Sequence, residues 1–120
     1  RDWSSDVCSS DLMAQIVEGI AAQNCGPEFH LSCVGAVVGA TYPEEMKYLR
    51  TLMPHVPILI PGYGAQGGGA ADVVGGFIPD GTGAIVNSSR GIIFASSGSD
   101  WKEAAQKAAE DMKADLLSVL

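Results

Sequence analysis

The sequence has little positive charge. Lys and Arg together number 7 against 14 Asp and Glu, which gives a net charge of −7, and Arg90 is the only Lys or Arg between Arg50 and Lys102. Proteins that bind nucleic acid or anionic membranes need clustered basic residues to neutralise phosphates. We therefore expect neither nucleic acid nor a membrane as a partner, whereas a small anion held by one arginine and backbone amides fits this charge.

Cysteines and long apolar runs are also scarce. The three cysteines (Cys8, Cys25 and Cys33) are odd in number and lack paired spacing, so we expect no disulfide framework and a reducing cytoplasm. Cys25, His30 and Cys33 lack a fourth ligand and zinc-like spacing, so we expect no metal. No apolar run reaches the roughly 18 residues of a membrane span, and we recognise no signal peptide.

Glycine, by contrast, is abundant, with 15 residues that mostly lie between positions 62 and 98. Such clustering indicates tight loops of the kind that often hold ligands. The hydrophobic share of 47% is high enough for a buried core. The length of 120 residues allows one small domain at most.

The first twelve residues, RDWSSDVCSSDL, differ in character from the rest. They are polar, have no apolar period, and resemble translated read-through of a sequencing adapter. We treat residues 1–12 as non-native and residues 13–120 as the domain. On this interpretation native residues upstream are missing, residues 1–12 are without fixed structure, and Cys8 has no function.

Three short apolar runs, each followed by a helical pattern, dominate the remainder. Residues 13–25 predict a first helix, and residues 34–40, 56–60 and 83–87 predict strands. Because the runs do not alternate with polar residues, we expect parallel strands buried on both faces. Helices are expected from Pro43, over residues 70–77, and from a capping box of Asp100 with Glu103. The order of elements indicates α/β architecture.

A glycine loop follows the second predicted strand. Gly62, Gly64 and Gly67 fit the pattern G-x-G-x-x-G, in which backbone N–H groups approach an anion and the next helix presents its N-terminus to it. Gln66, within this loop, could donate its amide to a phosphate oxygen. The alternatives are a glycine-rich turn packed against a neighbour and a solvated Gln66.

A second loop, residues 87–91, follows the third strand and contains Arg90. Its planar guanidinium suits phosphate, although a surface arginine is the alternative. In (β/α)8 (TIM) barrels the phosphate site commonly lies on the loops after strands seven and eight. Such a barrel needs about 250 residues, so we expect this chain to supply the three C-terminal strand–helix units of an incomplete barrel.

Three linked motifs, VGAVVGATYPEEMKYLR, IPGYGAQGG and GAIVNSSRGIIFAS, resemble the last three strand units of orotidine 5′-monophosphate decarboxylase, of the branch often called type 2. The resemblance implies a homodimeric barrel that converts orotidine 5′-monophosphate to UMP and CO2 in pyrimidine biosynthesis without a cofactor. It implies phosphate contacts from Gln66, Arg90, Ser89 and Gly91. It also implies a substrate-binding loop that begins at Pro61 and includes Gly62, Gly64 and Gly67, with Thr41 near the site mouth.

The catalytic Lys and Asp residues of that family have no counterpart here. They form an Asp-x-Lys-x-x-Asp arrangement, and the nearest imitation, residues 111–115, lies on the predicted final helix, where its spacing suits surface ion pairs. We therefore assign no catalytic residue, and we expect this chain, lacking the catalytic half, to be inactive on its own.

Two other classes of protein remain as alternatives. A nicotinamide-binding Rossmann module could use the Gly62, Gly64 and Gly67 loop, with Arg90 meeting an NADP 2′-phosphate. However, the segment after Gly67 predicts only a short, poor helix, and Asn87 stands where the acid that binds the ribose is usual. A non-catalytic α/β domain is the other alternative.

Overall fold

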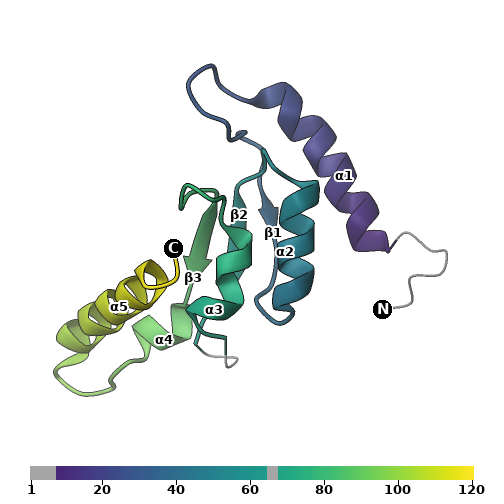
Figure 1. Ribbon diagram of the computed structural model, residues 1–120. Helices are drawn as coiled ribbons and strands as arrows, with labels where there is room; N and C mark the ends of the chain where they lie inside the picture. The colour runs from purple at the N-terminus through teal and green to yellow at the C-terminus, as the bar shows by residue number, and fades with distance from the viewer. Residues whose placement is uncertain (1–7, 65–67) are drawn as a thin grey trace.

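The computed structural model describes residues 8–64 and 68–120. Its elements follow one another as helix–strand units (Figure 1). They are α1 (Ser9–Ala21), η1 (Ala22–Asn24), β1 (Ala36–Val37), α2 (Pro43–Leu52), β2 (Ile58–Pro61), α3 (Ala70–Val73), η2 (Val74–Gly76), β3 (Ala84–Asn87), α4 (Ser89–Ile93) and α5 (Trp101–Leu117).

The three strands form one parallel sheet in the order β1-β2-β3. Ala36 pairs with Ile58, which pairs with Ala84, and one step along Val37, Leu59 and Ile85 form the next row. The prediction of three parallel strands is confirmed, with each strand shorter than or shifted slightly from its expected range. A helix connects each strand to the next, as parallel pairing requires.

The core lies on one face of this sheet. Figure 1 shows α2 and α3 side by side over the strands, and Met46 of α2, Val73 of α3 and Ile58 and Ile60 of β2 are fully buried between them. Helix α2 begins with Pro43 at its first position, where the missing N–H costs nothing. Met46 and Leu49 then recur at helical spacing on the buried side.

The opposite face of the sheet is exposed. Val37, Leu59 and Ile85, neighbours in register, are 68%, 39% and 67% exposed. The expectation that the strands are buried on both faces was therefore wrong for residues 8–64 and 68–120. An apolar run without alternation indicates what a strand can bury, but a second layer of structure must be present to bury it.

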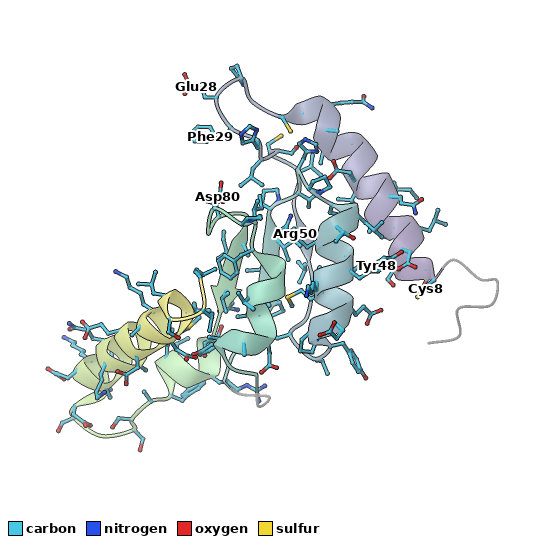
Figure 2. The ribbon with its side chains drawn as sticks, in the orientation of Figure 1. Cys8, Glu28, Phe29, Tyr48, Arg50 and Asp80 are labelled. Carbon is cyan, nitrogen blue, oxygen red and sulfur yellow. The ribbon has the colours of Figure 1, made fainter. Side chains whose placement is uncertain are left out.

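Arg50, near the end of α2, joins the elements at the N-terminal ends of β2 and β3 (labelled in Figure 2). The side chain is buried and donates four hydrogen bonds of 2.7–2.8 Å to backbone carbonyls, those of Met53, Val56, Gly76 and Gly83. Burial lowers the pKa of Arg50 from its ordinary value. The four carbonyl dipoles replace the water that the guanidinium loses.

Helix α1 differs from the expected helix at both ends. It begins at Ser9, so residues 9–12, which we expected to lack fixed structure, form its first turn. It ends at Ala21, and the single turn η1 continues to Asn24, one residue short of the predicted end. Glu18 joins α1 to the segment between α2 and β2, since its carboxylate accepts hydrogen bonds from the backbone N–H (3.1 Å) and the ring of His55. Residues 1–7 lie outside the described part of the chain.

The capping box predicted for α5 is absent. Asp100 precedes the helix but makes no side-chain cap; its Oδ1 instead accepts a hydrogen bond of 2.6 Å from Ser96 Oγ. A local serine therefore competes for the carboxylate that the sequence pattern assigns to the helix. None of the helices in the described ranges is long and apolar enough to cross a membrane.

Candidate functional site

A pocket of about 200 Å³ lies where β2 and β3 end. Pro61 of β2 pairs with Asn87 of β3, so the segments that follow these residues start side by side. The pocket is lined by Pro61, Gly62, Tyr63, Asn87, Ser88, Ser89 and Arg90. Four of the residues predicted from the sequence, Pro61, Gly62, Ser89 and Arg90, therefore share one pocket.

The segment after β2 folds back on itself through its glycines. Gly62 and Gly64 have φ values of 101° and 77°, in the left-handed region that glycine adopts without strain. The Gly64 N–H donates a 2.8 Å bond to the Gly68 carbonyl, which closes the loop. Gln66 and Gly67, both predicted site residues, lie outside the described residues.

The segment after β3, which we predicted as a loop over residues 87–91, is helical from Ser89. Helix α4 begins at Ser89, so Arg90 lies in a helical first turn. The first N–H groups of a helix lack intrahelical acceptors and carry partial positive charge. Ser89 and Arg90, the first two residues of α4, both line the pocket, and the Arg90 side chain is exposed.

Ser88 joins the two walls of the pocket. Its side chain is buried, and Ser88 Oγ donates a 2.8 Å bond to the backbone carbonyl of Tyr63. Gly91 makes this possible, because a Cβ at position 91 would lie 2.6 Å from Ser88 Oγ. The sequence motif NSSRG contains Ser88 and Gly91. It does not predict the contact between Ser88 and Tyr63, since this contact depends on how the two strands pair.

The N-terminus of α3 already holds two carboxylates. The Gly69 N–H donates to Asp72 Oδ2 at 2.8 Å, and the Ala70 N–H donates to Asp115 Oδ2 at 3.1 Å. Tyr63 also donates its hydroxyl to Asp115. The expectation that the helix after the glycine loop offers its N-terminal amides to an anion was therefore wrong for these two amides. Desolvation, aided by the bond to Asp115, raises the pKa of Tyr63 to about 12.

Thr41 lies apart from Arg90. It is exposed, follows β1, and lines a second pocket of about 290 Å³ together with Gly39, Tyr42 and Ser10 among others. Within residues 8–64 and 68–120, no three His, Cys, Asp or Glu side chains gather in a way that could hold a metal ion.

Comparison with known proteins points to one group of enzymes, although no family model matches the sequence. The chain is 49% identical over 121 residues to an orotidine 5′-phosphate decarboxylase of Variovorax paradoxus, an alignment that covers 92% of this chain and 44% of the relative. The enzyme of Paracidovorax citrulli is 46% identical, with 89% and 39% covered. The chain thus spans less than half the length of these curated relatives.

Solved structures agree with the sequence comparison. The OMP decarboxylase of Leishmania donovani matches with a TM-score of 0.62 and 26% identity, over 94% of this chain and 41% of that one. A putative orotidine-monophosphate decarboxylase from Toxoplasma gondii matches with a TM-score of 0.69 and 26% identity, over 91% and 42%. These neighbours are TIM barrels, and the three parallel strand–helix units form an incomplete part of that fold.

Proposed function

We propose, since the chain belongs to the orotidine 5′-phosphate decarboxylase family over the part that it spans, that its pocket binds the 5′-phosphate of orotidine 5′-monophosphate and of UMP. The reaction of the whole enzyme is then decarboxylation of orotidine 5′-monophosphate to UMP and CO2. No catalytic residue is assigned to this chain, whose contribution is to grip the substrate. The nicotinamide-binding alternative gains no support from these relatives.

The observation that carries the proposal is the convergence of Arg90 and the residues after β2 on one pocket. The guanidinium of Arg90 supplies charge-assisted hydrogen bonds, and the backbone amides of Ser89 and Gly91 at the start of α4 supply further donors. Because Asp72 and Asp115 occupy the start of α3, the phosphate is directed toward α4. Gln66 is proposed to contact the phosphate from the loop that includes Gly62, Gly64 and Gly67.

Other parts of the proposal rest on the family resemblance. Thr41, outside the phosphate pocket, is proposed to lie at the mouth of the substrate site. The whole enzyme is proposed to be a cytoplasmic homodimer that needs no cofactor. Phosphate contacts remote from the reacting carbon supply binding energy that is used in the transition state. Loss of these contacts should therefore lower the rate of decarboxylation as well as the affinity for the substrate.

Arg90→Ala tests the proposal. The variant should bind UMP and inorganic phosphate about tenfold to hundredfold more weakly, because a charge-assisted hydrogen bond contributes about 1.5–3 kcal/mol. Binding of uridine, which lacks the phosphate, should not change. Lys107→Ala is the matched control, since Lys107 is an exposed cation on α5 paired with Asp111. The affinities can be measured by NMR titration of the 120-residue chain.

Equal losses of UMP and uridine binding in Arg90→Ala would contradict the assignment of Arg90. An equal loss of UMP binding in Lys107→Ala would show that general charge, and not the pocket, attracts the ligand.

A further inference from the structure

One carboxylate on the last helix reaches back to the pocket. Asp115 Oδ2 accepts a hydrogen bond from the hydroxyl of Tyr63, 52 residues earlier in the chain, and another from the N–H of Ala70 at 3.1 Å. Both donors flank the glycine loop, Tyr63 near its start and Ala70 just after its end. Asp115 therefore closes the base of this loop against α5.

The neighbouring acid on the same helix behaves differently. Asp111, one turn earlier, pairs with Lys107 at 2.7 Å, and both side chains are well exposed. An i,i+4 pair of this kind contributes only a few tenths of a kcal/mol to a helix. The carboxylate of Asp115 instead contacts residues distant in sequence. An ion pair along the helix surface therefore does not explain its contacts.

Tyr63 is held from two directions. Its hydroxyl donates to Asp115, and its backbone carbonyl accepts the hydrogen bond of Ser88 Oγ at 2.8 Å. Ser88 directly precedes α4, which carries Arg90. A chain of hydrogen bonds thus runs from α5 through Tyr63 to the start of α4, and it joins the two walls of the phosphate pocket.

We infer that Asp115 is a positioning residue for the phosphate site: it fixes Tyr63 and the base of the glycine loop, and so holds one wall of the pocket opposite Arg90. This inference rests on the proposed function. A pocket fixed in advance binds more tightly, because less conformational freedom is lost when the ligand binds. The raised pKa of Tyr63, about 12, agrees with a phenol that keeps its proton for this contact.

Three variants of the 120-residue chain test the inference. Asp115→Ala removes both acceptor bonds and should weaken binding of UMP and inorganic phosphate about threefold to tenfold, as expected for hydrogen bonds of ordinary strength. Tyr63→Phe removes one hydroxyl and should have a smaller effect in the same direction. Asp111→Ala, the matched control on the same helix, should bind both ligands like the wild type.

Two readouts separate positioning from general stability. Uridine affinity should not change in Asp115→Ala, because only the phosphate wall is disturbed. Amide hydrogen exchange at Gly64 and Ala70 should accelerate, while exchange of the core strand β2 stays as in the wild type. Asp115→Asn, which keeps an acceptor oxygen, should restore most of the affinity.

The outcomes distinguish the two proposals. Wild-type chain that binds neither UMP nor phosphate overturns the proposed function, and the inference falls with it. Wild-type chain that binds both, together with unchanged affinity in Asp115→Ala, overturns the inference alone. If Asp115→Ala fails to fold, Tyr63→Phe decides: it leaves the Ala70 contact in place, and unchanged phosphate affinity in that variant counts against the inference.

Discussion

The glycine at position 91 has two separate explanations, one from the family resemblance and one from the structure. The motif NSSRG and the family resemblance assign Gly91 a backbone contact with phosphate, and that role stays a prediction. The structure adds a steric reason, because a side chain at position 91 would displace the Ser88 hydroxyl, which lies 2.6 Å from the site of a Cβ. The sequence could not reveal this reason, since it depends on the rotamer and burial of Ser88.

Gly91→Ala should therefore give a lower free energy of unfolding than the same substitution at a helical glycine that has free space around it. A Cβ added to Gly19 in α1 would meet no atom within 4 Å, so Gly19→Ala should stabilise by about 0.5–1 kcal/mol. The free energy of unfolding of Gly91→Ala should be lower than that of Gly19→Ala by about 1–3 kcal/mol, since Gly91→Ala disturbs the buried hydrogen bond between Ser88 and Tyr63. Urea denaturation measures both, and equal stabilisation would contradict the steric explanation.

Tyr63 should make the stability depend on pH in the alkaline range. Its pKa in the folded chain, about 12, lies above the ordinary 10.0, so the protonated phenol favours the folded state. This contribution is fully present below about pH 10 and is lost as pH rises through 12. The stability difference between wild type and Tyr63→Phe should shrink over that window. A difference that is constant up to pH 12 would argue against the raised pKa.

Among the elements, the strands were easier to predict than the helix ends. Three apolar runs without alternation, each ended by a loop, predict β1, β2 and β3 and their parallel direction, because local pattern and chain connectivity both restrict them. The start of α4 and the missing cap at Asp100 depend on competition between local hydrogen bonds, such as the one from Ser96 to Asp100. The pattern of residue types does not settle such competition.

The sequence pattern does not identify Arg50 as a structural residue, because its four carbonyl partners come from segments up to 33 residues away. Arg50→Met should destabilise the chain by at least about 3 kcal/mol, since it leaves buried carbonyls without donors. Arg50→Lys should be intermediate, because one ammonium cannot reproduce the geometry of a guanidinium. Lys47→Met, at an exposed position of α2, is the control, and a similar loss of stability there would contradict the assignment.

At the scale of the whole molecule, the exposed face of the sheet dominates. Val37 of β1 and Ile85 of β3 are about two-thirds exposed and lie in one row, on either side of Leu59. Sheets with open apolar faces and edges tend to associate. The double variant Val37→Thr with Ile85→Thr should reduce concentration-dependent association in sedimentation velocity while keeping β-branched residues in the strands. Phe29→Ser, on the loop after η1 (Figure 2), is the control at an equally exposed apolar residue. An equal effect of Phe29→Ser would show that the sheet face is not the site of association.

The position of Arg50 has a consequence for how such a chain can change. Its carbonyl partners Val56 and Gly83 lie just before β2 and β3, whereas the pocket residues lie at the last residues of these strands and directly after them. Tolerance to substitution should therefore differ along the strand axis. The segments that line the pocket can be exchanged for those of another enzyme to alter ligand preference. The contacts of Arg50 at the opposite ends of the strands stay unchanged in such an exchange and continue to stabilise the fold.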